Sequence, residues 1–380
     1  MRRTSWPWLA AAVLAAAACF FLLSGRILPG ASDRETGDQG FQLLGTVIQL
    51  IKHDYVDEPS PAKTMDGAFR GLVDSLDILS TYLTPADALK YQDSQKTVYQ
   101  DSGVVLLKAF GGFPQVVGLV DNSPAAQSGL KPGDAISSIN GRSTYGLSLV
   151  ETQLALKSRG NETAKIKVLR QARTMDLTLG RALPAGLPVS FTAAKGTAGI
   201  LRIRRIAAPC TVEVRATLNS RLRARSGPLV LDLRNCSEGD AEEARRLLNL
   251  FLQADRIGSF LKRQGGSEIL SCPQTPKWKS VPLAVWTNLG TQGAAELVAG
   301  VLQDFRRAKV IGLETPGLAA KTQLLSLPDG SALLLTTGVF ALNSGKKIWG
   351  EGVKPDGEID IRDDSPNSYL KKTINLLSSR

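Results

Sequence analysis

The stretch from Asn288 to Lys321 reads NLGTQGAAELVAGVLQDFRRAKVIGLETPGLAAK and alternates two kinds of secondary structure. A glycine-rich turn leads into an amphipathic segment of helical period, a short apolar strand follows, and a loop of small residues closes the unit. Similar patterns continue through residues 187–380, including PLVLDLRN at 228–235 and DAEEARRLLNLFLQ at 240–253. This alternation predicts an α/β core in which helices cover a sheet.

Length, composition and charge limit the classes of function. The 380 residues suffice for two folded domains, and 43% apolar with 21% charged residues is typical of a globular protein. The net charge of +11 lies mainly in the second half, where seven arginines fall between Arg202 and Arg225. Such a segment can face an anionic lipid or polymer, or form a solvated helix and strand. We favour the solvated face and expect no nucleic-acid partner, because no aromatic residues interleave and no nucleic-acid motif is present.

The N-terminal residues 1–31 predict a membrane segment. Arg3 and Arg26 enclose 22 uncharged residues, and roughly 20 apolar residues cross a bilayer core. The basic residues of the leading MRR favour a cytoplasmic N-terminus. We therefore expect a single-pass anchor in the inner (cytoplasmic) membrane, with the bulk of the chain exported to the periplasm or cell surface. Secretion after signal cleavage is the alternative, and Cys19 is a weaker candidate for lipid attachment.

The cysteine and histidine content argues against metal or histidine chemistry. Outside the membrane segment the chain has Cys210, Cys236 and Cys272, an odd number that permits at most one disulfide and fits no zinc spacing. The single histidine, His53, lies in a predicted amphipathic helix far along the chain from any glycine-rich turn. Any Ser-His or Cys-His site would have to use it. We expect no metal, no cofactor and no histidine-dependent catalysis.

Two further segments precede the α/β core. Residues 32–100 have helical periodicity and predict a small N-terminal helical segment. Residues 101–182 alternate short apolar strands with turns, centred on NSPAAQSGLKPGDAISSINGRS at 122–143. The order of strand, short helix, strand and longer helix resembles a PDZ domain. That resemblance implies a groove for an extended chain end, between the loop and strand at 102–106 and the helix at 149–157. The groove residues it implies are Gly103, Val104, Val105, Leu106, Leu149 and Gln153.

Residues 41–365 together resemble the C-terminal processing peptidases, also called tail-specific proteases. Besides the PDZ segment, the resemblance rests on FRGLVDSLDILSTYLTPADALKYQ at 69–92 and LPDGSALLLTTGVFALNSGKKIWGEGVKPDGEI at 327–359. It implies a multidomain α/β protein in which a helical cap, a PDZ domain and a crotonase-like α/β protease-type core follow the predicted N-terminal membrane anchor. The core would span residues 183–365, and a C-terminal tail residues 366–380. Members of this family are serine-type endopeptidases, in which a neutral lysine accepts the serine proton and a glutamine orients the lysine.

The residues that this chemistry requires are missing from the matching positions. The serine position falls on Gly293, the lysine position on Leu318 and the glutamine position on Thr322. In the turn that would bind the oxyanion, Glu238 replaces the first of two glycines and Gly239 is the second. A carboxylate there opposes the negative charge that develops during catalysis.

Two functional hypotheses follow. The first is an exported, membrane-anchored pseudoprotease that binds protein C-termini through its PDZ domain as a scaffold or regulator, with partners such as an active protease or a cell-envelope protein. The alternative is an active endopeptidase with displaced residues: Thr291 or Cys236 as nucleophile and Lys321 as base, with Gln323 beside the orienting position. We favour the first, because the second needs different register shifts and a misplacement of about 1 Å costs on the order of 100-fold in rate.

Overall fold

The computed structural model of the chain describes residues 32–96, 101–109, 111–158, 160, 162–180, 189–194, 198–222, 227–363 and 365–378. The chain forms two compact units, residues 1–67 and 68–380. The predicted membrane segment at residues 1–31 lies outside the described residues. Within the described residues, no helix combines the length and the apolar character that are needed to cross a bilayer.

The described part of the first unit is helical. Helix α2 spans Ser32–Asp54, and α3 begins at Pro61 and continues to Asp74. The side chain of His53, in the last turn of α2, is 88% exposed and bonds to the carboxylate of Asp54 at 2.6 Å.

A six-stranded sheet forms the centre of residues 68–380, in the order β19-β16-β15-β11-β9-β8. All neighbouring pairs in it are parallel except the antiparallel β8–β9 pair. Its strands are β8 (Val189–Ala194), β9 (Ala198–Ile203), β11 (Leu229–Asp232), β15 (Leu283–Thr287), β16 (Lys309–Gly312) and β19 (Gly357–Glu358). Every residue of β11 and β15 is buried, as expected for parallel strands that are covered on both faces.

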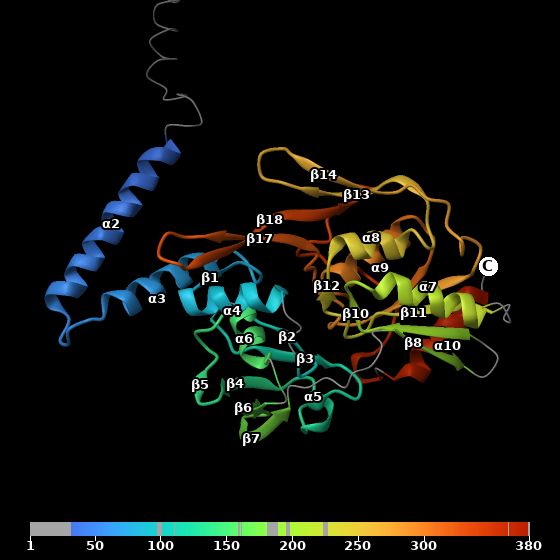
Figure 1. Cartoon of the computed structure of the whole chain (residues 1–380), viewed down its shortest axis with the longest axis horizontal. Coiled ribbons are helices and arrows are strands. Elements are labelled where there is room, and N and C mark those ends of the chain that lie inside the picture. The colour runs from blue at the N-terminus through green and yellow to red at the C-terminus, as the bar shows by residue number, and fades with distance from the viewer. Residues whose placement is uncertain are drawn as a thin grey trace, which may run out of the picture. The chain divides into compact units, whose positions relative to one another are not determined.

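Helices cover both faces of this sheet (Figure 1). On one face, Leu231 of β11 belongs to a core cluster with residues of α7 (Cys210–Arg221), α8 (Ala241–Leu248) and α9 (Ala294–Asp304). On the other face, Val230 packs with residues of α10 (Pro366–Ser378). Successive side chains of a strand point to opposite faces, so this arrangement confirms the predicted helix-covered sheet. The segment that we set apart as a C-terminal tail therefore contributes a helix to the core.

Helix α10 is joined to the turn that follows β11. Tyr369 of α10 is fully buried, and its hydroxyl donates to the backbone oxygen of Thr287 at 3.0 Å. The guanidinium of Arg234 lies 5.0 Å from the ring centre of Trp286 and 4.6 Å from that of Tyr369. The same guanidinium donates to both carboxylate oxygens of Asp232 at 2.8 Å. These cation–π contacts and paired hydrogen bonds fix the beginning of the turn.

An antiparallel sheet in the order β1-β18-β13-β14, with β17 paired to β18, supplies another part of the core. Its strands are β1 (Thr81–Leu83), β13 (Ala254–Leu261), β14 (Ser267–Cys272), β17 (Ala320–Ser326) and β18 (Ala332–Leu342). Helix α4 (Pro85–Lys96) follows β1, and two short strands, β10 (Arg205–Ile206) and β12 (Glu238–Gly239), pair in parallel.

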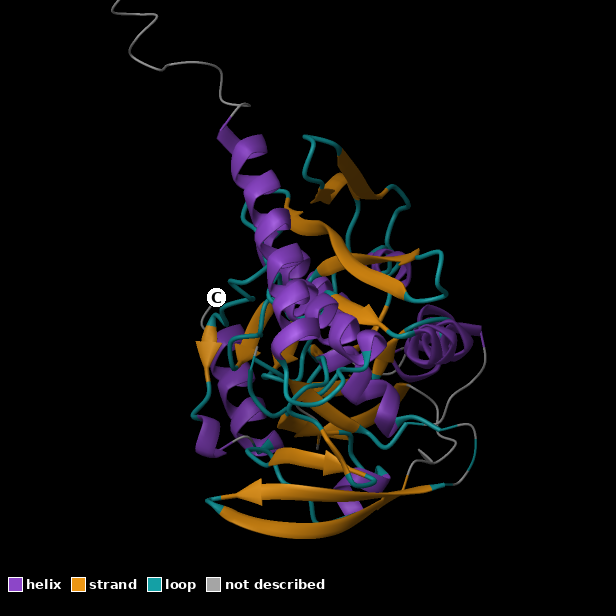
Figure 2. Ribbon diagram, turned by 90° about the vertical axis from the view of Figure 1, so that its left-hand side faces the viewer, coloured by secondary structure: helices purple, strands orange, loops and turns teal. Residues whose placement is uncertain are grey.

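The remaining sheet, β2-β3-β4-β6-β7 with β5 paired to β4, has the predicted PDZ order of elements. They are β2 (Val104–Leu107), β3 (Gln115–Leu119), α5 (Pro124–Gln127), β4 (Ala135–Ile139), β5 (Arg142–Ser143), α6 (Leu149–Leu156), β6 (Thr163–Arg170) and β7 (Arg173–Gly180). Ser123 caps α5 by accepting from the Ala126 amide, and Ser148 with Glu151 forms a capping box on α6. The β6–β7 hairpin forms the edge of this sheet (Figure 2).

Cys210, Cys236 and Cys272 are buried free thiols. Burial raises the pKa of Cys210 to about 12 and that of Cys272 to about 11, and it also raises the pKa of Cys236. These thiols are therefore protonated near neutral pH and poorly nucleophilic. Within the described residues, no group of three or more His, Cys, Asp or Glu side chains is placed to hold a metal ion.

Candidate functional site

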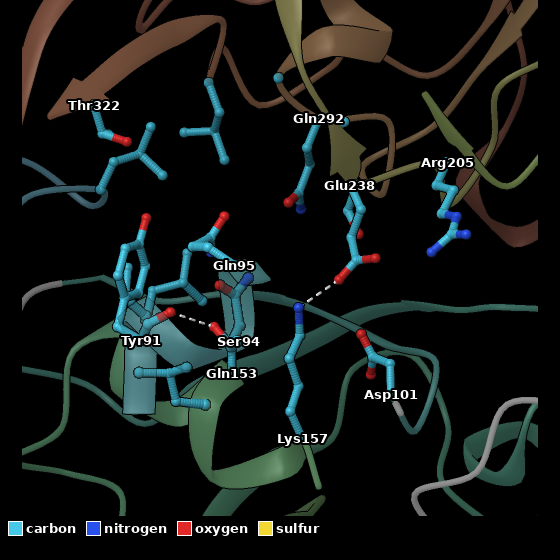
Figure 3. A pocket seen from close by; sticks show the side chains of 18 of the residues that line it. Tyr91, Ser94, Gln95, Asp101, Gln153, Lys157, Arg205, Glu238, Gln292 and Thr322 are labelled. Atoms are coloured by element: carbon cyan, nitrogen blue, oxygen red, sulfur yellow. Dashed lines mark hydrogen bonds and ion pairs between the residues drawn. The ribbon is translucent and has the colours of Figure 1, made fainter. Parts of the chain in front are cut away.

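A cavity of about 590 Å³ lies between the PDZ domain and the core (Figure 3). Its walls come from β2 and α6 of the PDZ domain, from α4, and from β12, β17 and the start of α9 in the core. It brings together two sets of residues that the sequence analysis singled out. These are Gly293, Leu318, Thr322, Glu238 and Gly239 from the protease-like core, and Val104, Leu149 and Gln153 from the PDZ groove.

Gly293 and Leu318 are neighbours at this cavity although they lie 25 residues apart in the chain. Gly293 is the N-cap of α9, with φ 58° and ψ −111°, a backbone conformation that glycine adopts readily. A Cβ added to Gly293 would have the Leu318 backbone oxygen as its nearest neighbour, at 3.9 Å. Leu318 is buried. The positions matched to the serine and the lysine therefore meet, but neither side chain can attack a carbonyl or accept a proton.

Glu296 holds the two positions together. Its Oε2 accepts from the amides of Gly293 at 2.9 Å and Leu318 at 2.6 Å, and its Oε1 accepts from the Gly317 amide at 2.6 Å and the Thr315 hydroxyl at 2.5 Å. Burial raises the pKa of Glu296 even though these four donors favour its charged form. The carboxylate thus fastens the start of α9 to the loop before β17.

The turn after β11 is bound both to the core and to the PDZ domain. Asn288 accepts from the amides of Asn235 and Gly290, both at 3.0 Å, and its side-chain amide donates to Asn235 Oδ1 at 2.9 Å. The Asn235 side chain in turn donates to the Leu119 backbone oxygen of β3 at 2.9 Å. Further along the turn, a Cβ on Gly239 would come within 2.7 Å of the Ile206 backbone oxygen. This second position of the turn therefore has room for glycine alone.

Glu238, one residue earlier, points into the cavity and meets Lys157, the residue that ends α6 (Figure 3). Lys157 Nζ lies 2.7 Å from Glu238 Oε1. Desolvation is the largest influence and would raise the pKa of Glu238, but Lys157, Asp101 and Arg205 together outweigh it and lower that pKa. Desolvation would likewise lower the pKa of Lys157, but Glu238 and Asp101 outweigh it and raise that pKa. The lysine is therefore firmly protonated, which makes it an anion-binding group and a poor general base.

Asp101 lies beside this ion pair. Desolvation, followed by the negative charge of Glu238, raises the pKa of Asp101 to about 6, and the two carboxyl groups share a hydrogen bond. Asp101 Oδ1 also accepts from the Gly103 amide at 3.0 Å. That amide belongs to the loop at which the PDZ resemblance places a ligand carboxylate.

The proposed replacement residues do not gather at the cavity. Lys321 of β17 pairs with Glu268 of β14, and its Nζ lies 4.7 Å from the ring centre of Phe260. Its neighbours Ala320 and Thr322 line the cavity, because side chains alternate along a strand. Gln323, next in the strand, is not among the residues that line the cavity.

The two candidate nucleophiles are also held elsewhere. Thr291 is fully buried; its hydroxyl donates to the Leu233 backbone oxygen at 2.9 Å and accepts from the Asn288 amide at 3.0 Å. Cys236 is fully buried in the main core cluster. The structure thus gives no support to the displaced pairs of Thr291 or Cys236 with Lys321.

The predicted groove residues divide into two groups. Val104, Leu149 and Gln153 line the cavity, Leu149 also being buried in the PDZ core, whereas the buried Val105 and Leu106 are not among the residues that line it. The backbone of β2 is partly engaged by the core, since Gln292 Nε2 donates to the Leu106 oxygen at 3.2 Å. Gly103, with φ 80°, provides the turn before β2.

Comparison with known proteins agrees with this architecture. The model of peptidase family S41 matches residues 197–359, and that of the PDZ domain matches residues 115–170. The chain is 26% identical to the carboxy-terminal processing protease CtpA of Bacillus subtilis (strain 168), over 94% of this chain and 77% of that protein. The chain belongs to the C-terminal processing peptidase family.

Other proteins similar to this chain extend the comparison. A probable CtpA-like serine protease of Staphylococcus aureus (strain bovine RF122 / ET3-1) is 26% identical over 86% of this chain and 66% of that protein. Among solved structures, the photosystem II D1 C-terminal processing protease superposes with a TM-score of 0.69 at 21% identity, covering 87% of this chain and 90% of that one. The structural likeness supports the fold, and the site must be judged from its own residues.

Sequence reasoning missed Lys157, Asp101 and Gln292 as cavity residues. Lys157 and Glu238 are 81 residues apart, so no local spacing indicates that they meet. A signal did exist: Lys157 ends the helix of the predicted groove, and Asp101 immediately precedes the predicted carboxylate loop.

Proposed function

We propose that this member of the C-terminal processing peptidases is a catalytically inactive protein that binds protein C-termini in the cavity between its PDZ domain and its core. One observation carries this proposal. The positions matched to the nucleophile and the base meet at the cavity, and they are Gly293 and Leu318. Hydrolysis needs a nucleophile whose proton has an acceptor within about 3 Å, and these side chains provide neither.

The cavity keeps features that suit an extended chain end. Val104, Leu149 and Leu154 offer apolar surface, and Lys157 offers a positive charge beside it. A peptide whose last residues are apolar and whose carboxylate is free matches this combination. Partners of this kind include an active protease or a cell-envelope protein with an exposed C-terminus.

We further propose that residues 1–31 anchor the protein in the cytoplasmic membrane, with the remainder exported. The run of 22 uncharged residues behind MRR supports this location. Full-length protein should stay in the membrane fraction through alkaline carbonate extraction, and a variant lacking residues 1–31 should not. Secretion after cleavage predicts instead a shortened chain in the soluble fraction.

Activity and binding are tested on the full chain in detergent. Incubation with an unfolded protein that ends in apolar residues should leave that substrate intact, whereas a labelled peptide ending in Leu-Ala-Val with a free carboxylate should bind saturably. Cleavage that disappears on Thr291→Ala or Lys321→Ala would establish the alternative, an active endopeptidase with displaced residues. Absence of saturable binding would contradict the binding role.

A further inference from the structure

Two groups suited to bind a carboxylate, Lys157 in the cavity and the Gly103 amide next to the cavity-lining Val104, are occupied by the chain's own carboxylates. The Gly103 amide donates to Asp101 at 3.0 Å, and Lys157 bonds to Glu238 at 2.7 Å. Asp101 and Gly103 belong to the PDZ side, and Glu238 to the core side. Carboxylates of the chain itself, one from each wall of the cavity, therefore take the places that a ligand carboxylate could occupy.

We propose that Glu238 competes with the terminal carboxylate of a ligand for Lys157. A chain end that binds in the cavity places its carboxylate on Lys157 and displaces Glu238. This inference rests on the proposed function and adds the residue that recognises the ligand's charge. Glu238 occupies the turn position where the family resemblance expects a glycine. The same substitution that opposes an oxyanion therefore provides an internal substitute for the ligand.

The ion pair is open enough for such an exchange. The side chain of Lys157 is 28% exposed and that of Glu238 is 41% exposed, so water reaches both groups and weakens their attraction. An arriving carboxylate replaces one anionic partner of Lys157 by another of the same chemistry. The affinity then depends on the difference in free energy between the Lys157–ligand contact and the Lys157–Glu238 contact, so Glu238 limits the affinity for the ligand.

Displacement changes the number of bound protons. Glu238 faces Lys157 of α6, Asp101 of the loop before β2 and Arg205 of β10; Lys157 also faces Tyr91 of α4. When Glu238 loses Lys157, it remains beside Asp101, and two neighbouring carboxylates hold one proton more tightly than before. The complex therefore takes up a proton near neutral pH, and affinity rises as the pH falls from about 8 to about 6.

The nearby acid Asp240 does not take part in this exchange. It lines the cavity, but its carboxylate caps α8 by accepting from the Glu243 amide at 2.8 Å. The competing carboxylates are therefore those of Glu238 and Asp101.

The test uses full-length protein in detergent and two probes, the Leu-Ala-Val peptide as free acid and as C-terminal amide. Affinity and proton uptake are measured by calorimetry at about pH 6 and about pH 8, in buffers of different ionisation enthalpy. The wild type should bind the acid more tightly at the lower pH, with proton uptake. Lys157→Met should weaken acid binding about 10-fold or more and leave the amide unchanged.

Glu238→Gln provides the opposite variant. It should bind the acid about 10-fold more tightly than the wild type at about pH 8 and should lose the proton uptake. Lys165→Met, which removes an exposed lysine of β6, is the matched control and should behave as the wild type.

The outcomes separate this inference from the proposed function. If acid and amide bind equally, or if Glu238→Gln changes neither affinity nor proton uptake, Glu238 does not compete and only the further inference falls. If neither peptide binds the wild type, both proposals fall. Should Lys157→Met not fold, the wild-type pH dependence and the Glu238→Gln variant decide between these outcomes.

Discussion

Glu296 and Gly293 lie three residues apart at the start of α9, yet the contacts around their side-chain positions differ. Glu296 accepts four hydrogen bonds and is fully buried. At Gly293, an added Cβ would meet nothing closer than 3.9 Å. The frame of the site is therefore fixed by buried hydrogen bonds, whereas Gly293, at the position matched to the nucleophile, has open space around it.

This difference shows that the side chains at the reacting positions can vary without disturbing the hydrogen bonds that hold the site. Replacing Glu296 strands four buried donors, which costs folding free energy. Glycine at the start of α9 and leucine in the loop before β17 leave the surrounding hydrogen bonds intact, because those bonds use backbone amides. The proposed function requires that recognition by the cavity walls and bond cleavage be separable in this fold.

The largest effect is expected from Glu296→Gln. An amide nitrogen cannot accept, so two of the four donors lose their partner in either orientation of the side chain. The free energy of unfolding should fall by about 2–4 kcal/mol, measured by denaturant titration. The control is Glu314→Gln, at an exposed position, which should be neutral. A loss below about 1 kcal/mol for Glu296→Gln would show that the frame is not fixed by this carboxylate.

Restoring the chemistry should reveal the role of Glu238. In the double variant Gly293→Ser/Leu318→Lys, a hydroxyl and an amine would stand at positions that meet, but Glu238 still opposes the oxyanion. Adding Glu238→Gly should accelerate cleavage of an unfolded protein substrate by about 100-fold or more, measured by fragment release. The control keeps Gly293 and carries the other two changes; it should be inactive. Equal cleavage rates for the double and triple variants would show that Glu238 does not oppose the oxyanion.

Asp101 should make the folded state sensitive to pH. Its pKa is about 6 in the folded protein against 3.8 as its ordinary value, so the folded state binds more protons between these values. Its contribution to stability therefore falls as the pH rises from about 4 to about 6. Asp101→Asn should remove this fall and stabilise the protein near neutral pH by about 1 kcal/mol, measured by thermal unfolding across pH.

Glu238 acts in the opposite direction, because Lys157 lowers its pKa below the ordinary 4.5. The contribution of Glu238 to the free energy of unfolding is fully present above pH 4.5 and is lost as the pH falls through the lowered pKa. For Asp101→Asn, the matched control is Asp176→Asn on β7. The Asp176 carboxylate is 81% exposed, and its replacement should leave the pH dependence of stability unchanged. An unchanged pH profile in Asp101→Asn would contradict the raised pKa.

The smallest effect is expected at Lys321. Its ion pair with Glu268 joins side chains that are 35% and 43% exposed, and such pairs contribute little in water. Lys321→Ala should change the free energy of unfolding by less than about 1 kcal/mol and leave peptide binding unaltered. A strong loss of binding would place Lys321 at the cavity after all.

Much of this organisation was available from sequence patterns. The alternation around Asn288–Lys321 predicted the helix-covered sheet, and the turns around Ser123 predicted the PDZ elements. The gapless alignment to the family motif placed the reacting positions on Gly293 and Leu318, which the fold brings together. These predictions work because local periodicity and turn chemistry reflect the backbone directly.

Side-chain direction and long-range pairing were harder to predict. Lys321 lies three residues from Leu318, but a strand alternates its faces and an irregularity in β17–β18 pairing falls between Lys321 and Thr322. The meeting of Lys157 with Glu238 depends on how two domains pack, which no local pattern encodes. The helical role of residues 366–378 had a weak signal in Tyr369 and Thr373, which lie one helical turn apart and are both buried.

The two aromatic rings around Arg234 have a consequence for the order in which the protein folds. They come from β15 and from α10, so the guanidinium beside Asp232 meets both rings only once α10 has packed against the sheet. We therefore expect the turn after β11 to reach its final form late in folding, after α10 docks.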